Sequence, residues 1–418
     1  MEGDNLVDDR SIATGSASAD EMSSTASLGR ARRFLMMSVL VSCGLSVSLI
    51  FTAIGPVLSS LSTRYGGGVR GDVIAQLMMT LPSIGVIIGG PLVGVLAGWW
   101  GARSLLLGAL FVYGVAGCSG IVIAEPYALL GTRFVLGVAA AGVATAAAAL
   151  IGELLDGIRR TRALGYSSAL ASAGSVVSVI AAGKLAAYGG VGLPFAIYGV
   201  AFLLLLAGIA SVPEVRTRAR TEEAAGFWTF SVSALGSIYL ALMAVTVVVF
   251  MTGIQVSFLL AAKGITNPDD QAWIIACASV GAATGGLIYS TAQTYLGRAR
   301  TFALCVAVMG LGNLLMGSQS EPSLLALGCA MNGIGAGMTI PHFGSKIIER
   351  APVAMRPRAL GLMYTMIFVG EFLNPWVVTP LHVKFGIDTA FLLVGAAALG
   401  GAGLAYLRQR QTPAAAQG

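Results

Sequence analysis

Residues 160–165 form the stretch RTRALG, and 196 residues further along the chain residues 356–361 form RPRALG. The same offset, without gaps, also aligns Gly89 with Gly285, Gly90 with Gly286, Gly101 with Gly297, Gly137 with Gly333, Glu153 with Glu349, Phe195 with Phe391 and Gly199 with Gly395. Glycine matches alone would be weak evidence in apolar helices, whereas the Glu, Arg and Phe pairs are harder to obtain by chance. One register that holds this far predicts two tandem halves.

The composition indicates that these halves lie in a membrane. Of 418 residues, 56% are hydrophobic and 11% are charged, against roughly 25% charged in an ordinary soluble domain. A helix needs about 20 apolar residues to cross a bilayer, and the sequence offers twelve such runs, near 35–58, 73–97, 104–124, 126–152, 164–187, 193–212, 228–252, 271–293, 301–318, 323–345, 359–380 and 388–407. We therefore expect an all-α integral membrane protein, with twelve transmembrane helices in two pseudo-symmetric six-helix halves.

The distribution of Lys and Arg predicts the orientation, because these residues are retained on the cytoplasmic side during insertion. With the N-terminus inside, the cytoplasmic segments hold 19 of them and the outer loops and helix ends hold five. This bias predicts a multi-pass protein of the cytoplasmic (inner) membrane with both termini in the cytoplasm. The net charge of +6 is then a topology signal, and we expect no nucleic-acid partner.

The domain organisation follows from these assignments. The first 33 residues lack apolar periodicity and are rich in Ser, Ala and Asp, which is typical of disorder. The predicted segments are a disordered cytoplasmic tail (1–33), an N-terminal six-helix half (34–212), a cytoplasmic linker (213–227), a C-terminal six-helix half (228–407) and a cytoplasmic tail (408–418).

Six helices per half return the chain to the same side, so both halves insert with the same orientation. The stretch GVLAGWWGAR (94–103) between the second and third runs contains Gly94, Gly101 and Arg103. The chain resembles the major facilitator superfamily over residues 34–407. The superfamily's loop motif at this place has the same Gly and Arg residues, and an Asp-Arg pair where this chain has Gly98 and Trp99. The resemblance implies a monomeric secondary transporter with a cavity between its halves.

Arg133 is the only cation well inside a predicted span, since Lys184 falls at the outer end of the span 164–187, and burying Arg133 costs about 2.5–3.5 kcal/mol on insertion scales. Its stretch LLGTRFVLG looks like the superfamily's fourth-helix motif, which favours a cation that faces the cavity and tunes a carboxyl group or holds an anionic substrate. The alternative is an Arg that reaches lipid headgroups from an outer helix end.

Glu371, in IFVGEFLNPWVV (367–378), is our candidate for proton coupling. Burial disfavours the ionised form of an acid, which suits a group that takes up and releases a proton. A structural Glu that is hydrogen-bonded to a neighbouring helix is an equally good interpretation. The remaining polar residues inside the spans are candidates for a substrate cavity or, alternatively, for hydrogen bonds between helices; they are Gln255, Asn332, His342 and Asn374.

Each R-x-R-A-L-G stretch falls in the cytoplasmic loop between the fourth and fifth helices of its half, with a Glu seven residues upstream. Such acid and base sets could form and break ion pairs as the halves move, or they could only determine topology. The predicted gate consists of Glu153, Arg160, Arg162, Glu349, Arg356 and Arg358.

Other chemistries have little support. The sequence has no Gly-rich loop that ends in Gly-Lys-Ser/Thr, and its two His and five Cys lack metal-ligand spacing. We expect no enzymatic activity, cofactor or metal, and a proton, a small organic solute and the lipid bilayer as partners. The apolar cavity favours a hydrophobic or amphipathic solute. We place export ahead of import, although the fifth helix lacks the Gly-Pro pair of many exporters; a proton-coupled importer and a membrane scaffold or enzyme are the alternatives.

Overall fold

The computed structural model describes residues 15–155, 157–214, 231–352 and 355–410, and this part of the chain is helical without β-strands. The N-terminal half contains α1 (Gly15–Thr52), η1 (Gly55–Val57), α2 (Leu58–Arg64), α3 (Gly68–Trp100), α4 (Ala102–Cys118), η2 (Ser119–Ile121), α5 (Pro126–Leu154), α6 (Gly157–Gly189), η3 (Leu193–Gly199) and α7 (Val200–Ser211).

The C-terminal half repeats the order of the long helices. It contains η4 (Ser231–Leu235), α9 (Gly236–Val249), η5 (Met251–Gln255), α10 (Val256–Ala262), α11 (Pro268–Leu296), α12 (Arg298–Ser318), α13 (Pro322–Arg350), α14 (Arg356–Phe385) and α15 (Ile387–Arg410). Twelve segments of the described chain are long and apolar enough to cross a membrane. The predicted all-α membrane fold with twelve spanning helices is confirmed.

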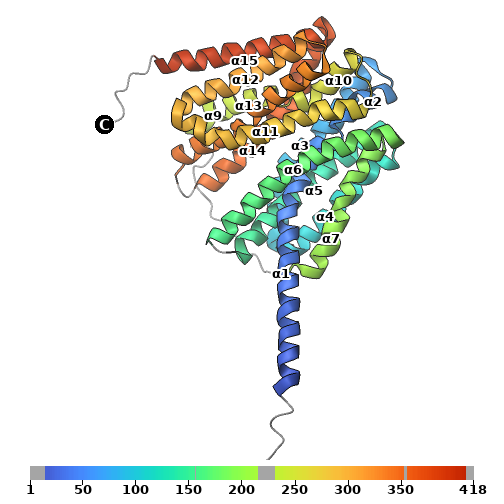
Figure 1. Cartoon of the computed structure of the whole chain (residues 1–418), viewed down its shortest axis with the longest axis vertical. Helices are drawn as coiled ribbons and strands as arrows, with labels where there is room; N and C mark the ends of the chain where they lie inside the picture. The colour runs from blue at the N-terminus through green and yellow to red at the C-terminus, as the bar shows by residue number, and fades with distance from the viewer. Residues whose placement is uncertain (1–14, 156, 215–230, 353–354, 411–418) are drawn as a thin grey trace, which may run out of the picture.

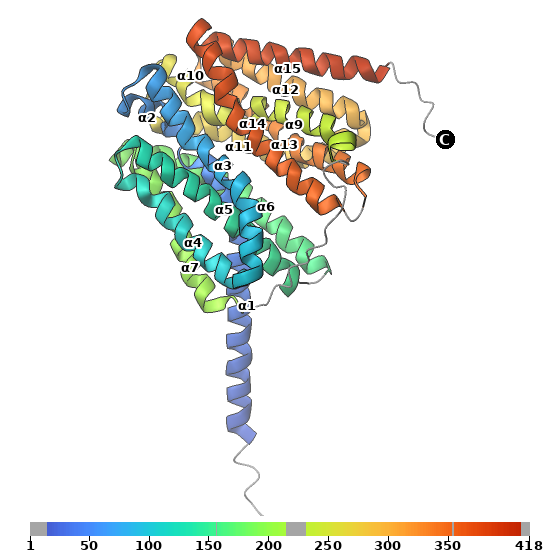
Figure 2. The same ribbon diagram turned by 180° about the vertical axis from the view of Figure 1, so that it is seen from behind.

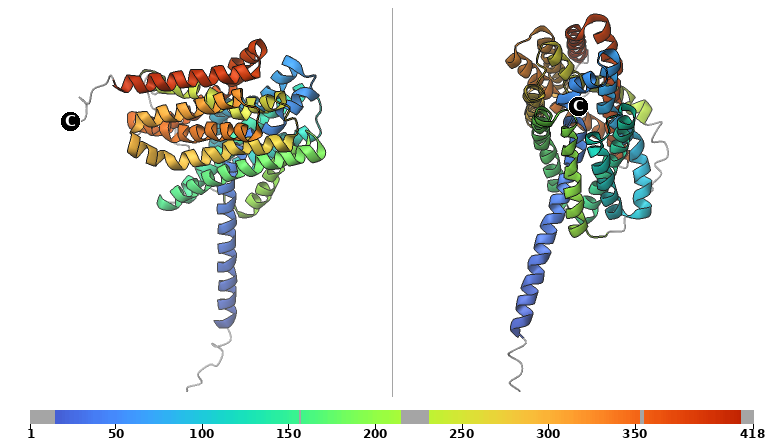
Figure 3. Two further views of the ribbon diagram at one scale, coloured as in Figure 1. Left: turned by 45° about the horizontal axis from the view of Figure 1, so that its top comes forward. Right: turned by 90° about the vertical axis from the view of Figure 1, so that its right-hand side faces the viewer.

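Helix α1 starts well before the membrane-spanning run. It begins at Gly15, so residues 15–33, which we expected to be disordered, are helical here and extend beyond the bundle (Figures 1 and 3). A helix that is already nucleated extends one residue at a time without a further nucleation cost, and Ala, Glu, Met and Arg in this stretch favour extension. Residues 1–14, most of the predicted linker (215–227) and residues 411–418 lie outside the described part.

The sequence repeat is also a repeat of helix contacts. Gly137 of α5 lies against the carbonyl oxygen of Pro82 of α3, and Gly333 of α13 lies against that of Ala278 of α11. Both members of this second pair follow their counterparts by 196 residues. A second pair of contacts repeats at the same offset of 196 residues: Gly85 lies against the carbonyl oxygen of Phe134, and Gly281 lies against that of Ala330. Small residues at these positions allow close helix approach, which stabilises helix pairs in membranes.

The two halves meet along α6 with α11 and along α3 with α14. Figures 1 and 2 show α6 and α11 side by side near the end of α6 and the start of α11, and separating toward their other ends. We call the described residues of the segments 30–33, 100–103, 154–162, 296–300 and 350–358 the basic end of each half. The loops at 65–67, 190–192, 263–267 and 386 form the opposite end.

Candidate functional site

The first and seventh spans are both interrupted, and the two interruptions face each other. Helix α1 ends at Thr52 and the chain continues through η1, which contains Pro56; a proline lacks the amide N–H that a helix needs. In the seventh span, α9 ends at Val249 and the π-helical turn η5 precedes α10. The ring centroids of Phe51 and Phe250, beside the two interruptions, are 5.6 Å apart. Interrupted helices leave backbone carbonyl groups free for other partners.

Three of the predicted cavity residues gather at the interruption in the C-terminal half. Asn332 Nδ2 donates to the carbonyl oxygen of Val248 at 3.1 Å, and Asn374 Nδ2 donates to that of Val247 at 2.8 Å. Gln255 Nε2 donates to Asn374 Oδ1 at 2.9 Å. Asn332 and Asn374 therefore bind carbonyl groups at the end of α9, and Asn374 also binds Gln255.

This amide group also joins the two halves. Gln255 Nε2 lies 3.3 Å from Gln76 Oε1 on α3, and Thr379 Oγ1 donates to the same oxygen at 2.9 Å. Gln76 and Thr379 were not among our predicted residues. Gln76 could have been selected from the sequence, since it is an amide inside an apolar run, as Gln255 is. Thr379 could not have been selected, because threonine is common in such helices.

Glu371 lies between the halves and is fully buried. Its Oε2 accepts a hydrogen bond from Ser83 Oγ of α3 at 2.5 Å, while no partner for its Oε1 is present in the described part of the chain. Asn374 lies one helical turn away on α14. On the other side Phe368 stacks on Phe51 with ring centroids 6.0 Å apart. We call Gln76, Ser83, Gln255, Glu371, Asn374 and Thr379 the interface cluster.

A second set of contacts between the halves lies nearer the opposite end. Ser59 Oγ of α2 lies 3.0 Å from Ser257 Oγ and 3.3 Å from Gln271 Nε2 of the C-terminal half, and within that half Ser257 donates to Gln271 Oε1 at 2.6 Å. At the surface, Lys184 Nζ and Asp269 Oδ2 are 3.4 Å apart. The hydrogen bonds and ion pairs that we describe between the halves therefore lie at the level of Glu371 or closer to the opposite end. Toward the basic end the helices of the two halves separate (Figure 1).

Arg133 lies elsewhere, inside the N-terminal half. Its Nη2 donates to the carbonyl oxygens of Ala116 and Gly117 at 2.8 and 2.9 Å. Its guanidinium carbon lies 4.8 Å from the ring centroid of Phe195 and 5.1 Å from that of Tyr198. The side chain is fully buried, so it does not reach lipid headgroups in this structure, and its partners are not those of Glu371.

His342 is enclosed by aromatic rings within the C-terminal half. Its ring stacks on Phe302 at 4.8 Å, and its Nδ1 lies 3.5 Å from the hydroxyl of Tyr289. It belongs to a cluster of α11, α12 and α13 and not to the interface cluster. The structure therefore brings together Gln255, Asn332, Asn374 and Glu371 and separates His342 from them.

The predicted gate residues lie at the basic ends, and the contacts described for Glu349 and Arg356 stay within the C-terminal half. Glu349 forms a bidentate ion pair with Arg298 of its own half, and Arg356 Nε donates to the carbonyl oxygen of Ala351 at 3.2 Å. Glu153, Arg160, Arg162 and Arg358 have exposed side chains.

The loop motif has a structural basis in both halves. Gly101 and Gly297 precede α4 and α12 with φ of 80° and 75°, a backbone conformation that favours glycine. Arg103 Nη2 donates to the carbonyl oxygen of Ile209 on α7 at 3.2 Å. Gly94 lies in α3, six residues before its end.

Comparison with known proteins identifies relatives of this architecture. The family model described as Major Facilitator Superfamily matches residues 40–262 and 238–418. An uncharacterized MFS-type transporter of Pseudomonas aeruginosa is 29% identical over 126 residues, which cover 30% of this chain and 31% of that relative. The multidrug efflux pump Tap of Mycolicibacterium fortuitum is 24% identical over 126 residues, with the same coverage. The matched stretches therefore span less than a third of these curated relatives.

Solved structures resemble the whole fold. A nucleoside transporter, NupG, superimposes with a TM-score of 0.72 at 12% identity, covering 90% of this chain and 100% of that one. A D-xylose-proton symporter superimposes with a TM-score of 0.70 at 16% identity, covering 89% and 97%. At these identities the likeness concerns the fold.

Proposed function

Because this chain belongs to the Major Facilitator Superfamily, we propose that it is a proton-coupled secondary transporter of a small organic solute. The two halves move against each other so that the space between them opens to one side of the membrane at a time. The observation that carries the proposal is the buried, half-satisfied carboxyl group of Glu371 between the halves. In the conformation described here the contacts between halves gather toward the opposite end, so access is from the basic end.

Glu371 is placed to connect protonation with the movement of the halves. Its hydrogen bond to Ser83 crosses from α14 to α3, so any change in the charge of the carboxyl group acts directly on the contact between the halves. An ionised carboxylate that is buried without a cation is costly, which favours binding a proton while the halves are closed around it. Arg133 contacts other residues, and we assign it a structural role.

The solute is a hydrophobic or amphipathic molecule, and export is the direction that we place first. The interface cluster offers amides and hydroxyls among aromatic rings, and Glu371 is its only ionisable member. Such a surface suits a molecule with a few polar groups better than a phosphate ester. The similarity to the efflux pump Tap, which covers 30% of the chain, favours the same choice. The similarity to a sugar-proton symporter is the argument for import.

The excess of Lys and Arg at the basic ends supports a cytoplasmic position for these ends and for both termini. The protein then resides in the cytoplasmic membrane, and the conformation described here faces inward. The acid and base sets at Glu153 and Glu349 form the cytoplasmic gate when the halves approach each other at this end.

The decisive experiment is transport in proteoliposomes with an imposed pH gradient, measured with a panel of labelled hydrophobic and amphipathic compounds. We compare the wild type with Glu371→Gln and with Glu321→Gln, which alters an exposed acid at the start of α13. We expect the gradient to drive transport by the wild type and Glu321→Gln, whereas Glu371→Gln retains only exchange. Equal responses of all three proteins would refute the role of Glu371, and no transport of any compound would favour the scaffold alternative.

The direction is tested in cells. A deletion strain that becomes sensitive to hydrophobic toxicants supports export. A deletion strain that is equally resistant but no longer grows on one carbon source refutes export and supports import.

A further inference from the structure

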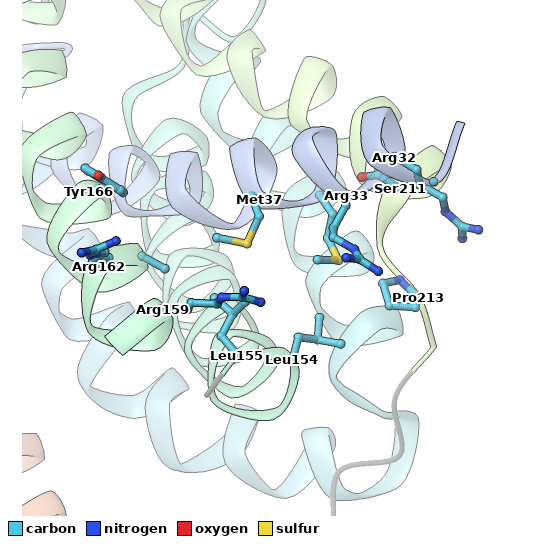
Figure 4. A pocket seen from close by; sticks show the side chains of 13 residues that line it. Arg32, Arg33, Met37, Leu154, Leu155, Arg159, Arg162, Tyr166, Ser211 and Pro213 are labelled. Atoms are coloured by element: carbon cyan, nitrogen blue, oxygen red, sulfur yellow. The ribbon is translucent and has the colours of Figure 1, made fainter. Parts of the chain in front are cut away.

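A cavity of about 840 Å³ opens at the basic end of the N-terminal half, where α5 and α7 end, α6 begins and the middle of α1 passes. It is separate from the interface cluster, because none of its lining residues belongs to that cluster. Figure 4 shows Arg33 of α1 and Arg159 of α6 entering the same space from two sides, while Arg32 points away from it. We call it the basic-end pocket.

The side chains that line the pocket carry positive charge and no negative charge. Four arginines line it, Arg32, Arg33, Arg159 and Arg162, and no Asp or Glu is among its lining residues. None of the four has an ion pair within the described part of the chain. Guanidinium groups bind phosphate with a planar fork of N–H donors, so the charge favours a phosphate-bearing ligand.

The remaining wall is apolar. Met36 and Met37 of α1 face Leu154 and Leu155 at the end of α5, and Ala163 of α6 completes this surface. A soluble anion gains nothing from such a wall, whereas a molecule with both a phosphate and a hydrocarbon tail gains from the arginines and from the methionines and leucines.

We propose that the basic-end pocket binds the headgroup of an anionic phospholipid from the adjacent membrane leaflet. The phosphate lies between Arg33 and Arg159, and the start of the acyl chains contacts Met37 and Leu155. The site is built at the level where spanning helices end, which is where headgroups lie. Bound lipid joins α1 to α6, and α6 is one of the helices along which the halves meet.

The test is a titration of the full chain in detergent, followed by native mass spectrometry, with phosphatidylglycerol, phosphatidylcholine or inorganic phosphate as the probe. The variant is Arg33→Gln with Arg159→Gln. The matched control, Arg300→Gln with Arg350→Gln, removes the same charge from exposed positions at the basic end of the other half. Size-exclusion chromatography checks folding, and Arg33→Gln alone is used if the double variant does not fold.

We expect the wild type to prefer phosphatidylglycerol and the pocket variant to bind it roughly thirtyfold more weakly, or about fivefold for the single variant. The control variant changes the affinity less than about threefold, since its arginines are outside the pocket. Equal binding of both phospholipids by the wild type, or equal losses in the pocket and control variants, overturns the proposal. Displacement of phosphatidylglycerol by millimolar inorganic phosphate overturns it in favour of a soluble anion.

Discussion

Replacing Arg133 by methionine distinguishes a structural arginine from one that acts in transport. Arg133→Met keeps most of the side-chain length and removes every donor. The carbonyl oxygens of Ala116 and Gly117 then lose their bonds of 2.8 and 2.9 Å, and Phe195 and Tyr198 lose the cation above their rings. The change is confined to the contact between α5, α4 and η3.

The magnitude follows from these contacts. Hydrogen bonds from a charged group contribute about 1.5–3 kcal/mol each, and a desolvated cation–π contact contributes up to about 2 kcal/mol. Removing the buried charge offsets part of this loss, because burying a guanidinium without a carboxylate has its own cost of several kcal/mol. We expect Arg133→Met to lower the free energy of unfolding by roughly 2–4 kcal/mol. Arg133→Lys, which keeps the charge without the fork, gives a smaller loss.

The assay combines thermal unfolding in detergent, followed by intrinsic fluorescence, with gradient-driven transport by the folded protein. We expect a lower Tm for Arg133→Met and an unchanged response to the pH gradient per folded molecule. A wild-type Tm together with a lost gradient response would refute this reasoning, and Arg133 would then act in coupling as its sequence motif suggested.

Two further predictions concern packing and the basic end. Gly137→Leu should prevent folding, because a side chain there overlaps the carbonyl oxygen of Pro82, whereas Gly131→Ala meets no atom within 4 Å and should behave as the wild type in size-exclusion chromatography. Glu349→Gln breaks the ion pair with Arg298; the Glu349 side chain is 53% exposed and that of Arg298 is 30% exposed. Exposed ion pairs contribute about 0–1 kcal/mol to stability, so we expect Tm to fall by less than about 3 °C. A larger fall in Tm would contradict the small contribution of this pair to stability.

The fold was predictable because its determinants are local and repeated. Spanning helices follow from apolar length, and the offset of 196 residues that aligned Gly137 with Gly333 also relates their contacts with Pro82 and Ala278. The interruptions in the first and seventh spans were missed. Pro56 was a visible signal for the first, but the turn η5 contains no proline, and its geometry depends on the contacts of Asn332 and Asn374 with the end of α9.

The candidate site was only partly predictable, because composition identifies polar residues in spans but not the side chains that they meet. Gln255, Asn374 and Glu371 were selected as costly residues, and the structure places them together. Arg133 was selected by the same rule and lies in another part of the fold. Ser83 carried no signal, although it is the residue that binds Glu371.

The contacts between the halves have a consequence for the energy of switching. Apart from the exposed pair of Lys184 and Asp269, the polar contacts between the halves that we describe are hydrogen bonds between hydroxyl, amide and carboxyl groups. Such bonds are worth on the order of 0.6 kcal/mol each inside a membrane, so together they resist separation of the halves by only a few kcal/mol. One elementary charge that crosses about 100 mV releases about 2.3 kcal/mol. The polar part of this closure is therefore comparable in energy to the movement of one charge across the membrane.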